Sequence, residues 1–169
     1  MSKLLRYHQS EDTCFVTTVT KGRKNILVEN VSLLTDVIRR QEESLGFRVV
    51  AYVTLPDHLH ILIEGKGIDL STIMRRIKLS FSKLYRDKYD MKQGHIWQHR
   101  FWDHIIRNQD DMNRHIDYIH YNPVKHGYVK RPFDGNIHRY IITGIIIRMI
   151  GGYSKKMNLR ENSESKIHG

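Results

Sequence analysis

The chain has little of what disulfides, thiolate metal clusters or membrane spans require. Cys14 is its only cysteine, which excludes an intrachain disulfide and a cysteine-based metal cluster and fits a reducing cytoplasm. The first six residues contain no apolar core of signal-peptide length. The apolar run 141–150 is interrupted by Gly144 and Arg148 and reaches about half the length that a bilayer span needs. We therefore expect a cytoplasmic protein that does not enter a membrane.

Acidic side chains are also scarce relative to basic ones. The chain carries 28 Lys and Arg against 18 Asp and Glu, which gives a formal net charge of +10 and a pI near 9.8. Such an excess favours a polyanionic partner, because each neutralised phosphate releases condensed counterions. Nucleic acid is the leading candidate, although the charge alone would suit a ribosomal or RNA-binding protein equally well.

The hydrophobic pattern predicts alternating strands and helices within one domain. Predicted strands cover 14–20, 47–55, 58–64 and a short segment at 105–106, and predicted helices run from Asn30 or Ser32 to Gly46, from Ser71 through Arg86, and from Asp110 or Asp111 to Pro123. The segments 47–55 and 58–64 should pair as a hairpin, with 47–55 as a central strand.

This order of elements, β-α-β-β-α-β followed by one more helix, defines the expected fold class. It is an α+β fold with a ferredoxin-like split β-α-β arrangement, a central antiparallel sheet, helices on one face and an added C-terminal catalytic helix. Residues 154–169 are polar and charged enough to form a disordered tail.

The first candidate functional segment is Pro56-Asp57-His58-Leu59-His60. Because side chains alternate along a strand, His58 and His60 share one face while the apolar residues between and after them occupy the other. Two imidazoles on one strand face can fix a divalent cation. Such pairs are more often merely solvated, so the segment is weak evidence by itself.

The second candidate segment is Asp117-Tyr118-Ile119-His120-Tyr121-Asn122-Pro123. On a helix, Tyr118 and Asn122 lie one turn apart on the same side. A phenol can act as a nucleophile when nearby positive charge favours its phenolate, and an amide oxygen can be a third metal ligand. A metal ion held by two imidazoles, a nucleophile and a basic chain together predict cleavage of a DNA strand.

Several alternatives compete with these assignments. Tyrosine on a helix is usually a packing residue, and Glu64, on the same strand face as His60, is a weaker candidate for the third ligand. The tyrosines that compete with Tyr118 are Tyr89, Tyr121 and Tyr128. The remaining histidines are expected to be hydrogen-bonded or surface residues, namely His95, His99, His104, His115, His120 and His126. Of these, His115 and His120 could replace Asn122 as the third ligand.

Basic and aromatic residues elsewhere are candidates for nucleic-acid contact. The helix after Ser71 has a cationic face, and the aromatic stretch 96–104 offers planes on which unpaired bases could stack, although paired Trp residues more often close a core. The candidate nucleic-acid-binding residues are Arg75, Arg76, Lys78, Lys83, Trp97, Arg100, Trp102 and Lys125.

Four segments together resemble the single-tyrosine HUH transposases, in particular the REP-associated tyrosine transposases, which are related to the transposases of the smallest insertion sequences. They are Leu55-Pro56-Asp57-His58-Leu59-His60, Ile96-Trp97-Gln98-His99-Arg100-Phe101-Trp102-Asp103-His104, Ile106-Arg107-Asn108 and Asp117-Tyr118-Ile119-His120-Tyr121-Asn122-Pro123-Val124-Lys125-His126-Gly127. The resemblance covers roughly residues 6 to 140. It implies a transposase domain over 1–140, followed by a divergent, partly disordered tail over 141–169.

The resemblance also implies a chemistry for the candidate residues. His58 and His60 would be metal ligands, Asn122 would occupy the position of the third ligand, and Tyr118 would be the attacking tyrosine. The implied cofactor is Mg²⁺ or Mn²⁺, and the implied substrate is single-stranded DNA folded into a hairpin. Cleavage would leave a 5′-phosphotyrosine and a free 3′-hydroxyl, in a monomer or a homodimer. The alternative is a nucleic-acid hairpin-binding protein derived from a transposase that no longer cuts.

Overall fold

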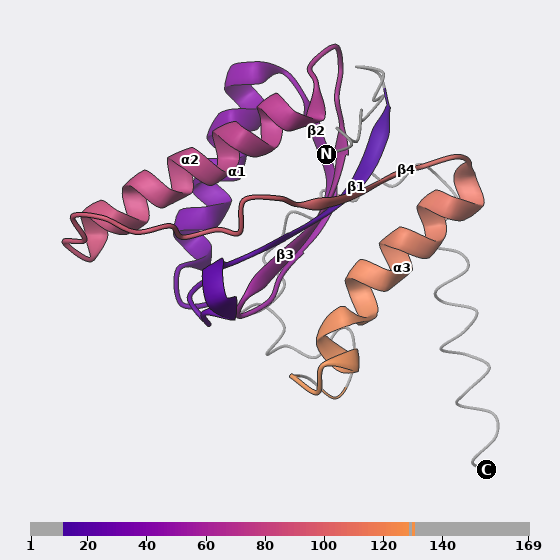
Figure 1. The fold of residues 1–169 in the computed structure, drawn as a ribbon. Helices are drawn as coiled ribbons and strands as arrows, with labels where there is room; N and C mark the ends of the chain where they lie inside the picture. Colours follow the sequence, from indigo (N-terminus) through magenta and orange to yellow (C-terminus); the bar gives the residue numbers. More distant parts are fainter. Residues whose placement is uncertain (1–11, 129, 131–169) are drawn as a thin grey trace, which may run out of the picture.

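A computed structural model describes residues 12–128 and 130, where four strands form one antiparallel sheet with helices on both faces (Figure 1). The elements are β1 (Thr13–Val19), a 3-10 turn (Lys21–Arg23), α1 (Val31–Leu45), β2 (Arg48–Thr54), β3 (His58–Glu64), α2 (Leu70–Lys88), β4 (Trp102–Ile105) and α3 (Gln109–Lys125). The strand order is β2-β3-β1-β4. The predicted α+β fold class with an antiparallel sheet is confirmed.

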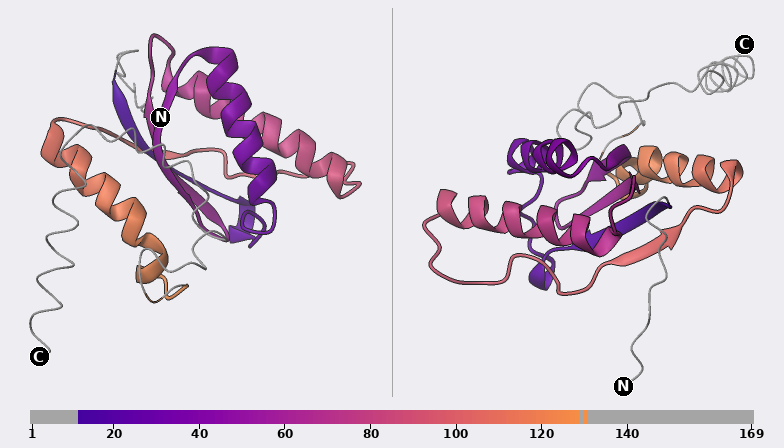
Figure 2. Two further views of the ribbon diagram at one scale, coloured as in Figure 1. Left: turned by 180° about the vertical axis from the view of Figure 1, so that it is seen from behind. Right: turned by 90° about the horizontal axis from the view of Figure 1, so that it is seen from above.

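The alternation of side chains along β3 gives the sheet two different faces. Leu59, Ile61 and Ile63 pack in the main core with the buried stripes of α1 and α2. On the opposite face, Leu62 joins a smaller cluster with Ile119 of α3. Figures 1 and 2 show α1 and α2 on one side of the sheet and α3 on the other. The predicted catalytic helix is therefore separated from the other two helices by the sheet.

The helix ends differ from the sequence-based expectation. Asp69, rather than Ser71, caps α2 by accepting a hydrogen bond from the amide of Thr72. Asn108, rather than Asp110 or Asp111, caps α3 by accepting from the amide of Asp111. Each true cap has an extended backbone, which turns its side-chain oxygen towards the free amides of the first turn.

The C-terminus of α3 and the position of β2 also differ. The helix continues past Pro123 to Lys125, and the His126 amide still donates to the carbonyl of Asn122. β2 lies at the edge of the sheet and not at its centre. Its apolar residues contribute to the hydrophobic clusters on both faces of the sheet. The apolar composition that predicted a central strand therefore reflects burial on both faces and not a central position.

No helix within residues 12–128 and 130 has both the length and the apolar character needed to cross a bilayer. The predicted tail over 141–169 lies outside the described residues.

Candidate active site

His58 and His60 lie next to each other on the face of β3 that α3 covers. Both side chains are buried, and their ring centroids are 4.9 Å apart in an edge-to-face arrangement. The predicted pairing of the two imidazoles on one strand face is confirmed by this geometry, because the intervening Leu59 packs in the core on the other side.

The orientation of His60 is fixed from β1. Thr17 is its partner in the β1–β3 register, and the threonine Oγ1 lies 2.8 Å from His60 Nδ1. A hydrogen on Nδ1 leaves the lone pair on Nε2. That Nε2 atom is buried and has no hydrogen-bond partner among the described residues. A buried nitrogen without a hydrogen-bond partner costs folding free energy, so we interpret this atom as available to bind a metal ion.

His58 is oriented by the residue that precedes it. Its Nδ1 lies 2.5 Å from Oδ1 of Asp57, whose other carboxylate oxygen accepts from Arg23 at 2.9 Å. The pKa of Asp57 is lowered overall: burial acts to raise it, and the bonds from His58 and Arg23 outweigh that effect. A carboxylate behind an imidazole is the usual second partner of a metal-binding histidine, because it fixes the ring and its tautomer.

His60 is held in its neutral form. Burial lowers the pKa of His60 to about 3, and electrostatic interaction with the neighbouring His58, His126 and Lys125 acts in the same direction. Only a neutral imidazole offers a lone pair, so His60 can serve as a ligand throughout the neutral pH range.

Tyr118 of α3 lies directly against this pair. Its ring centroid is 5.1 Å from that of His60, in an edge-to-face arrangement, and its side chain is 37% exposed. The Lys125 ammonium lies 5.4 Å from the centroid of the Tyr118 ring. The phenol is therefore close to the imidazoles, accessible from solvent and next to the ammonium of Lys125.

Asn122 is buried one helical turn after Tyr118. Both amide atoms of its side chain lack a hydrogen-bond partner among the described residues. One further turn along, the ring centroid of His126 lies 5.6 Å from that of His58. Since Tyr118 contacts His60 and His126 contacts His58, the intervening Asn122 faces the imidazole pair. The unpartnered Nε2 of His60 and amide oxygen of Asn122 fit a divalent cation held between β3 and α3.

The alternatives weighed from the sequence fit less well. Glu64 pairs with Arg48 at 2.5 Å and with Lys66 at 3.1 Å, so its carboxylate is already neutralised. Tyr89 donates to Asn30 on the far side of the sheet. Tyr121 is 49% exposed on α3.

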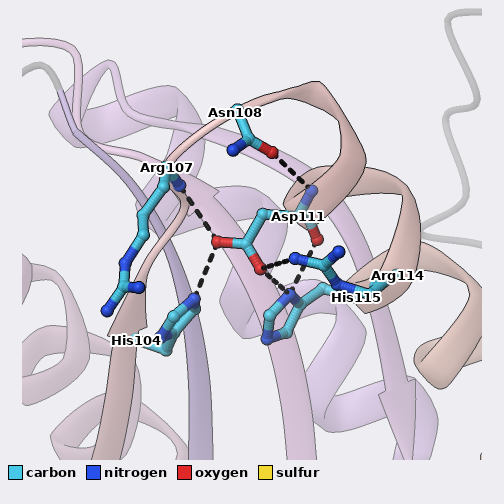
Figure 3. Close-up of polar contacts among 6 residues, drawn as sticks. All are labelled: His104, Arg107, Asn108, Asp111, Arg114 and His115. Carbon is cyan, nitrogen blue, oxygen red and sulfur yellow. Dashed lines mark hydrogen bonds and ion pairs between the residues drawn. The ribbon is translucent and has the colours of Figure 1, made fainter.

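A second group of ionisable side chains surrounds Asp111 at the start of α3 (Figure 3). One carboxylate oxygen accepts from His104 Nε2 at 2.8 Å and from the Arg107 amide at 3.0 Å, and the other accepts from Arg114 at 3.3 Å. His115 Nδ1 donates to the Asp111 carbonyl at 2.8 Å. The bonds from His104 and then from the Arg107 amide hold the pKa of Asp111 well below its usual range.

This group has three potential metal ligands, but its donors and acceptors already satisfy one another. A carbonyl can only accept, so the nearby Nδ1 of His115 carries a hydrogen and has no lone pair there. His104 Nε2 likewise donates to the carboxylate. The His58 and His60 site is the better cation site because Nε2 of His60 and the amide oxygen of Asn122 have no hydrogen-bond partner among the described residues.

The two tryptophans in the predicted stacking segment have different environments. Trp97 is 6% exposed and packs against Phe81 of α2 with ring centroids 5.4 Å apart, so it belongs to the core and cannot stack on a base. Trp102 is 57% exposed on β4 and contacts Phe15, which lies on the α3 face of the sheet. Of these two residues, only Trp102 offers an accessible indole on the face of the sheet that carries His58, His60 and Tyr118.

The predicted basic residues are divided between the two faces. Lys125 lies on α3 beside Tyr118, whereas Arg75, Arg76 and Lys83 are exposed on α2 across the sheet, and Arg100 is exposed just before β4. Lys78 is used within the protein, since its ammonium donates to the carbonyls of Gln98 and His99.

A groove of about 470 Å³ runs between α2 and the segment 94–101. Its lining combines Arg75, Arg86 and His95 with apolar Leu79 and Phe101. It lies on the α2 side of the molecule, away from His58 and His60.

Sequence reasoning missed the residues that hold the site in place. Asp57 could have been found, because it directly precedes His58 and a carboxylate often supports a ligand histidine. Thr17 carries no such signal, since its contact with His60 depends on the β1–β3 register. The hydrogen bonds of the Asp111 group form only because α3 packs against β4, and no pattern of neighbouring residues in the sequence predicts that packing.

Comparisons with known proteins agree with this architecture. Residues 9–122 match the family model described as Transposase IS200 like. The REP-associated tyrosine transposase of Escherichia coli K12 is 36% identical over 152 residues, which cover 86% of this chain and 88% of that protein.

Two solved structures are also similar to this chain. A structure of a REP-associated tyrosine transposase bound to a REP hairpin is 37% identical, with a TM-score of 0.66 over 78% of each chain. A Deinococcus radiodurans structure is 20% identical, with a TM-score of 0.51 over 72% of this chain and 97% of that one, and shows a shared fold only.

Proposed function

The chain belongs to the IS200-like transposases and, within them, to the REP-associated tyrosine group, and from this premise we propose that it nicks and rejoins single-stranded DNA through Tyr118. The resemblance carried by the four sequence segments is thereby confirmed at the level of the family. The observation that supports the mechanism most directly is the contact between the Tyr118 and His60 rings, whose centroids are 5.1 Å apart.

In the proposed reaction, the Tyr118 oxygen attacks the phosphorus of one phosphodiester. The phenol loses its proton, the bond from phosphorus to the 3′-oxygen breaks, and the leaving oxygen gains a proton. The products are a 5′-phosphotyrosine and a free 3′-hydroxyl. Because the energy of the phosphodiester is retained in the tyrosine linkage, a 3′-hydroxyl can reverse the step and join new ends.

The residues around Tyr118 have separate roles in this proposal. Lys125, whose ammonium lies over the Tyr118 ring, would contact the anionic phosphate that Tyr118 attacks. His58, His60 and Asn122 would hold Mg²⁺ or Mn²⁺, with Asp57 and Thr17 fixing the two rings. When bound, the cation supplies charge stabilisation for the scissile phosphate. All four site residues come from one chain, which supports an active site complete in a monomer and compatible with a homodimer.

The proposed substrate is a DNA hairpin with a single-stranded flank. The related structure contains a REP hairpin, and the charge of +10 on this chain favours a nucleic acid. Trp102 and Arg100 would contact the flank near Tyr118, since aromatic and guanidinium planes stack on unpaired bases. Arg75, Arg76 and Lys83 would contact phosphates of the stem on the α2 side. Lys78 has at most a minor part, because its ammonium is engaged.

An end-labelled hairpin oligonucleotide, incubated with the protein and Mn²⁺, tests the proposal. Wild-type protein is expected to form a covalent adduct that survives denaturing electrophoresis, and Tyr118→Phe is expected to form none. Tyr121→Phe, an exposed tyrosine one turn away on α3, is the matched control and should form the adduct at the wild-type rate. Tight hairpin binding without any adduct would instead support a non-cleaving hairpin-binding protein.

A further inference from the structure

Four chemically distinct side chains share one face of α3. Asp111, His115, Tyr118 and Asn122 are separated by four, three and four residues, which corresponds to one stripe along a helix of 3.6 residues per turn. The stripe begins with the hydrogen-bonded carboxylate and ends with the proposed nucleophile and ligand. Any rotation of α3 about its axis would therefore move all of them together.

The carboxylate end of the stripe is the part most firmly attached to the sheet. Asp111 is 5% exposed, and it accepts hydrogen bonds from His104 on β4 and from the Arg107 amide in the connection between β4 and α3. Asn108 caps the same turn. The start of α3 is thus joined both to its neighbouring strand and to the preceding loop.

Ring contacts connect this attachment to the reacting group. The His115 ring is stacked on His104, with centroids 4.8 Å apart, and contacts Phe15 of β1 at 4.7 Å. Phe15 in turn contacts Tyr118 at 5.8 Å and His60 at 5.5 Å. The side chains between Asp111 and the phenol are therefore in continuous contact along the sheet surface.

We propose that Asp111, through its bonds to His104 and the Arg107 amide, is a positioning residue that sets the rotation of α3 and so directs the Tyr118 oxygen towards the phosphate held beside His60. This inference rests on the proposed function of Tyr118. It assigns to Asp111 an effect on the rate of attack rather than on metal or DNA binding, because its carboxylate is engaged by His104, the Arg107 amide and Arg114.

The effect should be large because attack on phosphorus needs alignment as well as proximity. A nucleophile displaced by about 1 Å can lose about a hundredfold in rate. Asp111→Asn keeps the size of the side chain but removes its charge and leaves one acceptor oxygen in place of two, so its amide nitrogen must face donors, either those of His104 and the Arg107 amide or that of Arg114. We expect adduct formation in a single turnover to slow by about 10- to 100-fold. Hairpin affinity and Mn²⁺ affinity should both stay within twofold of wild type.

Asp110→Asn is the matched control. Asp110 is an exposed aspartate in the same first turn of α3, so its replacement removes the same charge near the helix N-terminus. It should leave the rate of adduct formation unchanged. A similar slowing in both variants would show that helix charge, and not the bonds of Asp111, is responsible, and would overturn the inference.

A second pair of variants tests the bond without altering Asp111. In His104→Gln the amide nitrogen can still donate to the carboxylate, whereas His104→Ala removes the donor. We expect the glutamine variant to retain most of the wild-type rate and the alanine variant to be slowed about as much as Asp111→Asn. A purely structural role for His104 would not distinguish the two in this way at equal thermal stability.

Three further results would overturn the inference. They are wild-type rates in both Asp111→Asn and His104→Ala, a parallel loss of hairpin binding in Asp111→Asn, and a loss of Mn²⁺ binding in Asp111→Asn, which would identify the group as a metal site. The Tyr118→Phe variant separates this inference from the proposed function. If Tyr118→Phe still forms the adduct, the proposed function fails, whereas normal cleavage by the Asp111 and His104 variants leaves the proposed function intact.

Discussion

Thr17 and His60 face each other across the β1–β3 pairing, with the threonine hydroxyl oxygen 2.8 Å from Nδ1 of the imidazole. This bond accounts for the one ring nitrogen of His60 that has a partner. It leaves the other nitrogen directed into the space between β3 and α3, where Tyr118 lies.

Thr17→Val is therefore expected to weaken metal binding without unfolding the protein. The substitution keeps the shape of the side chain and removes the partner that holds the orientation of the His60 ring. Loss of such a partner typically costs about 10- to 100-fold in metal affinity. Titration calorimetry with Mn²⁺ measures the effect. Thr18→Val is the control, because the Thr18 hydroxyl is buried on the other face without a hydrogen-bond partner among the described residues. Equal affinities in the two variants would contradict the role of Thr17.

Asn122→Ala should cost little stability in the absence of metal. In the wild type both amide atoms of Asn122 are buried without a partner among the described residues, which carries a penalty of about 1–3 kcal/mol. Removing the amide relieves this penalty and offsets the lost packing, so urea unfolding in EDTA should differ from wild type by less than about 1 kcal/mol.

The same variant should lose most of the stabilisation that Mn²⁺ confers. A ligand that binds only the folded state stabilises it in proportion to its affinity. The difference between unfolding midpoints with Mn²⁺ and with EDTA should therefore shrink in Asn122→Ala. A large loss of stability in EDTA, together with an unchanged response to Mn²⁺, would show that the amide serves packing and is not a ligand.

The two tryptophans should respond in opposite ways to replacement by alanine. Trp97→Ala removes a buried indole from the contact with Phe81 and is expected to lower the free energy of unfolding by about 3–5 kcal/mol. Trp102→Ala removes an exposed indole, so stability should hardly change. Its affinity for a hairpin with a single-stranded flank should fall by about 1–3 kcal/mol, while affinity for a blunt hairpin is retained. Fluorescence anisotropy with both oligonucleotides measures this, and equal losses for the two substrates would exclude base stacking on Trp102.

Cys14 should be chemically inert in the folded protein. Burial, followed by the charges of Asp12 and Asp103, raises the pKa of Cys14 to about 12. Since the thiolate is the reactive form, the reaction with a disulfide reagent at pH 8 should be at least about 100-fold slower in buffer than in urea. The change in absorbance of the reagent follows both rates. Fast labelling without denaturant would indicate that β1 opens readily.

Sequence reasoning predicted the parts of the fold that depend on local periodicity. The bounds of β3 agree with the prediction, and β1, expected over 14–20, lies one residue earlier at Thr13–Val19. The stripe of Ile73, Ile77 and Phe81 on α2 and the shared face of His58 and His60 also follow from helical spacing or alternation. These patterns depend only on residues that are close in the sequence, so they can be recognised without knowledge of the tertiary structure.

What the sequence could not predict depends on how elements meet. Asn108, Asp110 and Asp111 follow β4 within a few residues, and each is of a residue type that commonly caps a helix N-terminus. Only the packing of α3 against β4 decides that Asn108 caps the helix while Asp111 binds His104. The burial of Trp97 has the same origin, since tryptophans in one segment can face either the core or solvent.

The hairpin between β2 and β3 has a consequence for how the protein acquires its chemistry. Leu55 donates from its amide to the carbonyl of His58, which fixes the residue at which β3 begins. A shift of one residue against β1 would turn both imidazoles towards α1 and α2 and bring Leu59 and Ile61 beneath Tyr118. A chain misaligned in this way could keep much of its secondary structure and still be inactive. Correct formation of this turn during folding therefore determines whether a molecule becomes an enzyme.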